Sequence, residues 1–344
     1  DHFAMETVGN TEFTQWQGHD FSMRGMSSLE TACMSGLGHL LSFTGTDTIP
    51  AIEFAEHYYN ANVETELVGA SVPATEHSVM CMGTKDDEIA TFERLIDKYP
   101  SGILSVVSDT WDLWKVCTEY LPAIKAKVLA REGKLVIRPD SGDPVDILCW
   151  LEGKEGHTVF FRDGQRRIKD NDTGISREIS EAEYKGVIEL LWDTFGGTVT
   201  EKGYKLLDSH IGAIYGDSIN YDRSQKIFER LDAKGFASTN VVLGVGSYSL
   251  AFVTRDTHGS AQKATYIEVN GIGIEIFKDP ITDGGVKKSA KGLLQVYKDE
   301  NNKICLKDQC TWEEEGKGLL QIIFEDGQFY NETTLTKIRE KLNN

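Results

Sequence analysis

The feature that most constrains the fold is a unit that recurs along the chain: a short apolar run, a polar or glycine-rich loop, and a segment long enough for a helix. Residues 134–144 (KLVIRPDSGDP) contain the start of such a unit. The apolar run is typical of a buried strand, and Asp143 followed by Pro144 is typical of a helix N-cap and first turn. A helix-capping turn would explain this one loop by itself, but Arg138 and Asp140 also fall where parallel β/α folds place their chemistry.

Six further apolar runs end in a similar way, and they are residues 40–43, 69–72, 103–107, 211–215, 241–243 and 266–269. Strands that alternate with helix-length segments, such as residues 222–234 before Gly235, favour a parallel sheet. Seven such strands predict an α/β protein with a closed or nearly closed β/α barrel whose loops share one rim. An open doubly wound sheet is the alternative that the same pattern allows.

Two regions depart from this pattern. Residues 153–180 are rich in charged residues and glycine and contain Asp163-Gly164, a hairpin signal, so we expect a solvated insertion on the barrel. Residues 292–344 carry hairpin signals near residues 298–302 and at Asp326-Gly327, and they end in an amphipathic segment. This tail predicts a small β-containing C-terminal appendage.

The charge of the chain excludes two classes of partner. Its 344 residues include 54 acidic and 36 basic side chains, which give a formal net charge of −18. A surface for nucleic acid or for an anionic membrane needs a basic face, so we expect neither partner. No apolar run approaches the roughly 18 residues that span a bilayer, and the N-terminus has no signal-peptide pattern. The six cysteines form no CxxC pair and no zinc spacing, which predicts a reduced, cytoplasmic protein.

The loops at the predicted rim collect residues that bear chemistry. They are Asp47, Asp109, Asp140, Asp217, His77, Arg24, Arg138 and Arg255. The turn at residues 244–247 (GVGS) precedes a predicted helix start, where free N–H groups favour a phosphate. Lys263 and Lys278 belong to a local cluster of lysines in this acidic chain, which favours a phosphate or pyrophosphate ligand. A solvated surface is the alternative interpretation of that cluster.

Nine short motifs identify a family resemblance. They are residues 21–25 (FSMRG), 45–48 (GTDT), 71–78 (SVPATEHS), 105–109 (SVVSD), 138–142 (RPDSG), 216–217 (GD), 254–256 (TRD), 270–273 (NGIG) and 277–280 (FKDP). In their types and order the chain resembles the nicotinamide phosphoribosyltransferases from about residue 6 to its end, apart from the insertion. The resemblance implies a type II phosphoribosyltransferase fold, an irregular α/β barrel with an α/β sandwich. It also implies transfer of phosphoribosyl from phosphoribosyl pyrophosphate to nicotinamide, which forms nicotinamide mononucleotide and pyrophosphate in NAD salvage.

The resemblance also implies roles for residues near the pyridine ring. Phe21 would stack on the ring, and Asp47 would accept a hydrogen bond from its carboxamide. Arg24 and Arg138 would contact the ligand near the ring and the diphosphate. Ser105 would be a further substrate contact.

A catalytic set follows from the same resemblance and consists of His77, Asp109, Arg138 and Asp140. His77 would be phosphorylated by ATP, with Glu76 and Asp109 as candidates to orient it. Asp140 would hold the ribose hydroxyls and Mg²⁺. The remaining ribose and phosphate contacts would be Gly216, Asp217, Gly246, Ser247, Arg255, Lys263 and Lys278.

The chain departs from the family pattern in two places. The phosphate loop carries side chains at Val245 and Tyr248, where the family has more glycine. About the first third of the family's usual length is absent, so residues 1–20 would be a remnant of an N-terminal domain or linker and residues 21–291 the barrel. Because the family completes its site across a homodimer with N-terminal residues, we expect a homodimer and a poor catalyst when the chain is alone.

Three other functions are compatible with parts of the sequence. A nicotinate or quinolinate phosphoribosyltransferase of the same fold is disfavoured because Asp47 would repel an acidic ring substituent. A noncatalytic fragment that binds a mononucleotide and needs a partner chain fits the missing length. A barrel hydrolase with Asp109 and Asp140 as an acid/base pair rests on two carboxylates alone.

Overall fold

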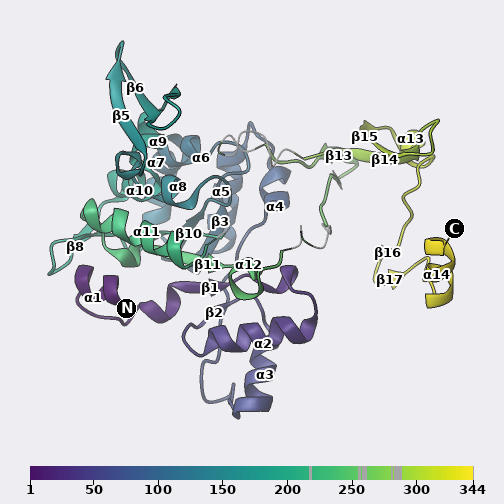
Figure 1. The fold of residues 1–344 in the computed structure, drawn as a ribbon, viewed down its shortest axis with the longest axis horizontal. Helices are drawn as coiled ribbons and strands as arrows, with labels where there is room; N and C mark the ends of the chain where they lie inside the picture. Colours follow the sequence, from purple (N-terminus) through teal and green to yellow (C-terminus); the bar gives the residue numbers. More distant parts are fainter. Residues whose placement is uncertain (217–218, 255–256, 258–261, 280–281, 283–288, 344) are drawn as a thin grey trace. The chain divides into compact units, whose positions relative to one another are not determined.

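The computed structural model describes residues 1–216, 219–254, 257, 262–279, 282 and 289–343 (Figure 1). Its internal contacts divide the chain into two units. The barrel unit comprises Asp1–Gln262 and Lys278–Lys288, and the hairpin unit comprises Lys263–Phe277 and Ser289–Asn344. The domain boundaries expected from the sequence stay predictions.

A parallel six-stranded sheet in the order β2-β1-β11-β10-β4-β3 forms the centre of the barrel unit. Because all neighbours run parallel, the carboxyl ends of the strands meet at one rim. The strands are β1 (Gly18–Asp20), β2 (Gly45–Thr46), β3 (Ser101–Val107), β4 (Glu132–Arg138), β10 (Ile211–Tyr215) and β11 (Val241–Val245).

One extended segment, residues 70–75, pairs with both edges of this sheet. At the β2 edge Ala70 pairs with Gly45, and the Thr46 N–H donates to the Ala70 carbonyl at 2.9 Å. At the β3 edge Ala74 pairs with Ser105, whose carbonyl accepts from the next residue of the segment at 3.0 Å. The sheet therefore curls into an irregular β/α barrel, as the sequence predicts, and the open doubly wound alternative is wrong.

Helices cover the outside of this sheet. The buried strand side chains Leu104, Ile137 and Tyr215 belong to one core with Phe92 and Leu191 from the helices, and full burial of such a side chain contributes about 1.5–3 kcal/mol. None of the described helices is both long and apolar enough to cross a bilayer. The α-helices of this unit are α1 (His2–Thr7), α2 (Leu29–Leu40), α3 (Pro50–Tyr59), α4 (His77–Met82), α5 (Glu88–Lys98), α6 (Leu113–Lys115), α7 (Leu121–Leu129), α8 (Pro144–Leu148), α9 (Glu181–Lys185), α10 (Val187–Phe195), α11 (Tyr221–Ala233) and α12 (Ser247–Ala251).

Several local predictions are confirmed. The Asp143 carboxylate caps α8 by accepting from the N–H groups of Val145 and Asp146, with Pro144 in the first turn. The insertion forms the antiparallel strands β5 (His157–Arg162), β6 (Gln165–Asp170) and β7 (Ser176–Glu178). Asp163 and Gly164 both have positive φ, at 52° and 78°, as a tight hairpin turn requires. Figure 1 shows β5 and β6 projecting from the barrel unit as a two-stranded arm.

The hairpin unit contains antiparallel pairs and two short helices. The turns expected near residues 298–302 and at Asp326-Gly327 join β14 to β15 and β16 to β17, and the terminal helix is present. Its elements are β12 (Tyr266–Val269), β13 (Ile272–Glu275), β14 (Leu293–Lys298), β15 (Ile304–Cys310), α13 (Trp312–Glu315), β16 (Phe324–Glu325), β17 (Gln328–Phe329) and α14 (Leu335–Asn343).

Three expected barrel strands differ from the structure. Residues 40–43 are not a strand, because α2 runs to Leu40 and the pairing falls on β2. Residues 69–72 contribute a single bridge at Ala70 rather than a ladder. Residues 266–269 pair antiparallel with β13, since an apolar run of this length does not reveal which partner it takes.

The structure also contains a strand that the apolar pattern misses. The β1 residues Gly18, His19 and Asp20 are all buried, although two of them are polar. They pair with both β2 and β11, so backbone hydrogen bonds and not apolar side chains define this strand.

Glu88 at the start of α5 is a buried carboxyl, with 1% of its surface exposed. Burial raises its pKa to about 8, and the negative charges of Asp112 and Asp109 add to that effect. The carboxyl of an unfolded chain has a pKa of about 4.3, so the folded state binds the proton more tightly. The stability that protonated Glu88 contributes is therefore fully present below the pKa of the unfolded chain. This contribution is lost as the pH rises through the pKa of Glu88 in the folded chain.

Replacing Thr75 by Val tests residues 70–75, which are called the closing segment because they pair with both edges of the sheet. The Thr75 hydroxyl oxygen accepts a hydrogen bond from the Val107 N–H at 2.9 Å, and Thr75 is buried. The near-isosteric Thr75→Val leaves that N–H without its acceptor, so the free energy of unfolding should fall by about 1–3 kcal/mol in urea denaturation. Thr158→Val, at an exposed hydroxyl of the insertion, is the control and should stay within about 0.5 kcal/mol. Equal stability of the two variants would contradict the closure.

Replacing Glu88 by Gln should flatten the pH dependence of stability. Between about pH 5 and pH 8 the native chain should lose up to about 1.4 kcal/mol per pH unit from this group, whereas Glu88→Gln should not. The measurement is urea unfolding at several pH values. Glu93→Gln, on the same helix but with a side chain that is 47% exposed, should keep the slope of the native chain. An unchanged slope in Glu88→Gln would show that Glu88 is not the titrating group.

Candidate active site

A cavity of about 420 Å³ lies at the carboxyl rim of the barrel. This volume falls in the range of small-molecule sites, which is about 300–1,000 Å³. Its walls come from the loops after β1, β2, β4 and β10 and from the end of the closing segment. The lining residues are Phe21, Met23, Arg24, Asp47, Glu76, Arg138, Asp140 and Gly216. Six of them, all except Met23 and Glu76, are among the site residues proposed from the sequence.

The Phe21 ring packs against main-chain atoms of glycine residues at the ends of two strands. A Cβ at Gly244 would fall 2.5 Å from the Phe21 Cδ2 atom, and one at Gly216 would fall 3.5 Å from its Cε2 atom. The ring also lies 4.7 Å from the His19 ring, and the Arg138 guanidinium carbon lies 6.0 Å from the Phe21 ring centre. Gly244 therefore allows the aromatic ring to approach the end of β11, whereas a Cβ at Gly216 would make only an ordinary contact with the ring.

Asp47 is an ionised acceptor at the wall of this cavity. Its Oδ1 atom lies 2.8 Å from the His19 Nε2 atom and accepts a hydrogen bond from the Ser71 hydroxyl at 2.6 Å. Burial opposes ionisation, but these hydrogen bonds outweigh it and lower the pKa of the carboxyl, with help from the positive charge of Arg138. Sequence reasoning missed His19 and Ser71 as site residues, although Ser71 opens one of the family motifs.

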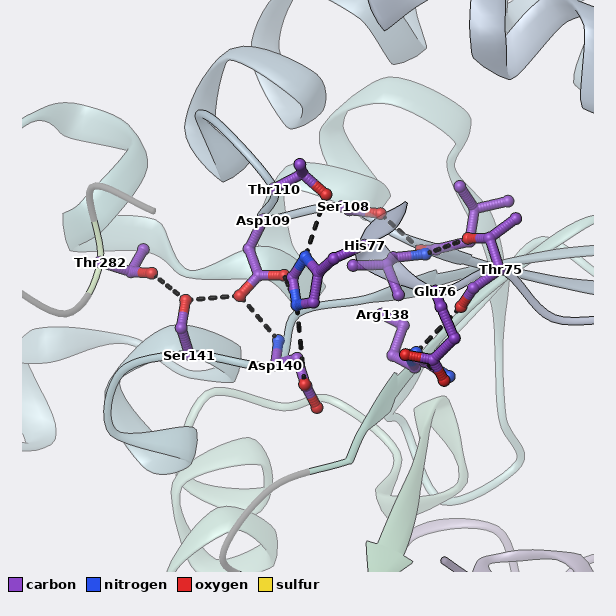
Figure 2. A network of polar contacts seen from close by, with 12 residues as sticks. Thr75, Glu76, His77, Ser108, Asp109, Thr110, Arg138, Asp140, Ser141 and Thr282 are labelled. Carbon is purple, nitrogen blue, oxygen red and sulfur yellow. Dashed lines mark hydrogen bonds and ion pairs between the residues drawn. The ribbon is translucent and has the colours of Figure 1, made fainter. Parts of the chain in front are cut away.

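His77, the first residue of α4, lies among hydroxyl and carboxylate groups (Figure 2). Its Nδ1 atom is 3.1 Å from the Thr110 hydroxyl oxygen. Its Nε2 atom is 3.8 Å from a carboxylate oxygen of Asp140 and 4.0 Å from one of Asp109. No described residue forms a hydrogen bond with this Nε2 atom, and the side chain is 16% exposed.

Asp109 is held in place by its neighbours. Its Oδ2 atom accepts from the Asp140 N–H at 3.0 Å and from the Ser141 hydroxyl. Figure 2 shows Ser141 between Asp109 and Thr282, whose hydroxyl contacts that of Ser141. A backbone N–H and a hydroxyl from the loop after β4 therefore hold the carboxylate that faces His77.

Arg138 supplies positive charge inside the rim. Its Nη2 atom donates to the Thr75 carbonyl at 2.9 Å and lies 3.4 Å from a Glu76 carboxylate oxygen. Its Nε–H has no hydrogen-bond acceptor among the described residues. The Asp109 Oδ1 atom likewise accepts no hydrogen bond from a described residue. A buried polar group without a partner costs about 1–3 kcal/mol, so the site is built for further polar contacts.

The other residues proposed from the sequence are not among the described residues that line this cavity. Ser105 is buried within β3, and Gly246 precedes α12, which begins at the buried Ser247. Lys278 belongs to the barrel unit, and Lys263 belongs to the hairpin unit, where its Nζ donates to the Ala290 carbonyl. Asp217 and Arg255 lie outside the described residues.

One carboxylate of the cavity fits the coordination preferences of Mg²⁺. Within the described part of the chain, no group of three or more His, Cys, Asp or Glu is arranged to hold a metal ion. Mg²⁺ usually binds one or two carboxylates and completes its shell with water and substrate phosphates. Asp140 offers such a carboxylate at the cavity wall, with 19% of its side chain exposed.

Comparison with known proteins identifies relatives of this chain. Residues 16–317 match the model of the nicotinate phosphoribosyltransferase (NAPRTase) family. A nicotinamide phosphoribosyltransferase of Acinetobacter baylyi is 47% identical over 347 aligned positions, which cover 99% of this chain and 63% of that protein. One from Mycoplasma pneumoniae is 39% identical over 303 positions, which cover 86% of this chain and 59% of that protein.

The chain thus spans about three fifths of the length of these relatives. A solved structure of nicotinate phosphoribosyltransferase from Vibrio cholerae aligns with a TM-score of 0.41 and 12% identity over 78% of this chain and 51% of that one. A likeness this weak supports no structural argument. The family model and the relatives are sufficient: the chain belongs to the nicotinate phosphoribosyltransferase family.

Proposed function

We propose that this barrel binds nicotinamide and phosphoribosyl pyrophosphate and joins them into nicotinamide mononucleotide and pyrophosphate, a reaction of NAD salvage. The observation that carries the proposal is the cavity in which Phe21 lies beside the ionised carboxylate of Asp47. The aromatic ring offers a stacking surface for a pyridine, and the carboxylate accepts from a carboxamide N–H₂ group. The names of the relatives, nicotinamide phosphoribosyltransferase, support the same substrate.

The reaction requires little covalent chemistry from the protein. The pyridine nitrogen attacks C1 of the ribose, the bond from C1 to the pyrophosphate oxygen breaks, and the leaving group keeps the electron pair. The nitrogen has a free lone pair, so no general base is needed. The chain would supply orientation through Phe21 and Asp47 and positive charge for the diphosphate through Arg24 and Arg138.

Mg²⁺ completes the charge balance in this proposal. Bound to the phosphates, the ion would offset negative charge that develops on the departing pyrophosphate. Asp140 is the residue that would hold it, because its carboxylate lines the cavity. The same carboxylate would also accept hydrogen bonds from the ribose hydroxyls.

We also propose that His77 is the acceptor of a phosphoryl group from ATP. In that step the His77 Nε2 lone pair attacks the γ-phosphorus, a P–N bond forms, and the P–O bond to ADP breaks. The position of Nε2 supports this, since it faces Asp109 and Asp140 without a hydrogen-bond partner among the described residues. Asp109, fixed by Ser141, would orient the ring and stabilise the positive charge that develops on it.

The cellular setting belongs to the same proposal. The resemblance to the family supports a homodimer, and the free state of the cysteines supports a reducing compartment such as the cytoplasm. No observation favours a nicotinate phosphoribosyltransferase or a barrel hydrolase instead. Asp47 disfavours nicotinate, and Asp109 is too deeply buried, at 1% exposed, to serve a hydrolase as a rim acid or base.

Replacing Asp47 by Asn should reduce the preference for nicotinamide over nicotinate. The substitution removes the charge that repels the acid and weakens the acceptor for the amide. The value of kcat/KM for nicotinamide should fall by about tenfold to a hundredfold, because a hydrogen bond to a charged group is worth about 1.5–3 kcal/mol. The measurement is kcat/KM for both substrates. Asp163→Asn in the insertion is the charge-matched control, and an unaltered ratio in Asp47→Asn would remove the basis for the proposed substrate.

Phosphorylation of His77 predicts an acid-labile mass increase. The purified chain, incubated with ATP and Mg²⁺ at neutral to alkaline pH, should gain one phosphoryl group by intact mass spectrometry, and acid should remove it. His77→Ala should abolish the increase, whereas His157→Ala in the insertion should not. A His77→Ala chain that is labelled as strongly as the native chain would assign the phosphate to another residue.

A further inference from the structure

The two oxygens of Asp47 have different surroundings. Oδ1 lies within hydrogen-bond distance of the His19 Nε2 atom, at 2.8 Å, and of the Ser71 hydroxyl, at 2.6 Å. Among the residues that the structure describes, none donates a hydrogen bond to Oδ2. Because Asp47 lines the cavity and its side chain is 45% exposed, its second oxygen is the one left for a ligand.

We propose that His19 and Ser71 are positioning residues that hold the Asp47 carboxylate in the orientation that receives a ring carboxamide. The inference rests on the proposed function and deepens it, since it assigns the choice between amide and acid to three residues. On this view Asp47 alone is insufficient for the preference.

The physical reason is the protonation state of Asp47. Burial by itself favours the neutral carboxyl, and a neutral carboxyl carries an O–H that could donate to the carboxylate of nicotinate. Hydrogen bonds from His19 and Ser71 favour the charged form, which accepts from an amide and repels an acid. The two donors therefore keep the residue in the state that discriminates.

The backbone fixes the donor ring in this position. His19 is the central residue of β1, paired with Gly45 on one side and Gly244 on the other. A Cβ at Gly45 would lie 2.7 Å from the His19 Nδ1 atom, so glycine leaves room for the imidazole. The same imidazole packs against Phe21, with ring centres 4.7 Å apart. One side chain thus supports both the stacking ring and the amide acceptor.

Other charged groups act on this network from neighbouring elements. Arg138 from β4 favours the ionised form of Asp47. His39 from α2 interacts with both His19 and Asp20, and burial lowers the pKa of His39, which disfavours a positive charge on His39. Variants of His39 and Arg138 would therefore confuse the test, and both residues stay unchanged in it.

The test uses a conservative and a disruptive variant at each donor. His19→Phe keeps an aromatic ring against Phe21 but has no donor, whereas His19→Gln keeps an N–H donor. Ser71→Ala removes the second donor, and Ser71→Thr keeps it. Ser176→Ala, in the insertion, is the matched control.

The first readout is the ratio of kcat/KM for nicotinamide to kcat/KM for nicotinate. His19→Phe and Ser71→Ala should each lower it by about threefold to tenfold, as expected for one lost hydrogen bond. His19→Gln and Ser71→Thr should recover most of it. The second readout is the acid limb of kcat/KM for nicotinamide, which should move to higher pH in the disruptive variants, because one hydrogen bond fewer then opposes the effect of burial on the pKa of Asp47.

A ¹³C NMR titration of the Asp47 carboxyl, assigned with Asp47→Asn, supplies a measurement that needs no turnover. If both disruptive variants left the ratio, the acid limb and this titration unchanged while Asp47→Asn altered the ratio, the positioning role would be wrong and the proposed function would stand. If the native chain neither bound nicotinamide nor formed its mononucleotide, the proposed function would fail, and the inference with it. Should His19→Phe not fold, Ser71→Ala decides the question by itself.

Discussion

The pairing of residues 70–75 with both edges of the sheet is the interaction on which the rest of the structure depends. The β2 strand that it joins has only two residues, and the neighbouring β1 has three, so these short strands gain their register from their neighbours. The closing segment and the residues directly after it also carry site residues, namely Ser71, Glu76 and His77. Closure of the barrel and assembly of the rim are consequently one structural event.

For an acidic chain to bind the proposed anionic substrate, its charges must be arranged locally. The rim achieves this by tying carboxylates to donors, as with Asp47 and Asp109, while the guanidinium of Arg138 stays partly unpaired among the described residues. A carboxylate that already accepts hydrogen bonds is well defined in charge and direction. The net charge of −18 therefore describes the surface more than it describes the site.

The sequence allowed prediction of the long strands and of most of the cavity, for an understandable reason. Runs such as residues 135–137 are apolar because both faces are covered, and the polar residue after each run lies at the rim. β1 has no apolar signal because it is stabilised by backbone pairing. The sequence pattern therefore does not predict β1, nor does it place His19 in the site. The hairpin strand at residues 266–269 was misassigned because local apolarity does not reveal whether a partner runs parallel or antiparallel. Contacts such as Ser71 with Asp47 join separate strands and have no local signature.

The backbone beneath Phe21 separates two properties that many sites combine. The position of the Phe21 ring depends on the missing Cβ at Gly244, whereas the proposed polar selection at the ring edge depends on exchangeable side chains. Substitutions at Asp47 and its hydrogen-bond donors would thus change which substituent of the pyridine ring is accepted. The aromatic surface on which the ring lies would not move. A barrel built in this way keeps one aromatic stacking surface, Phe21, for a series of related rings.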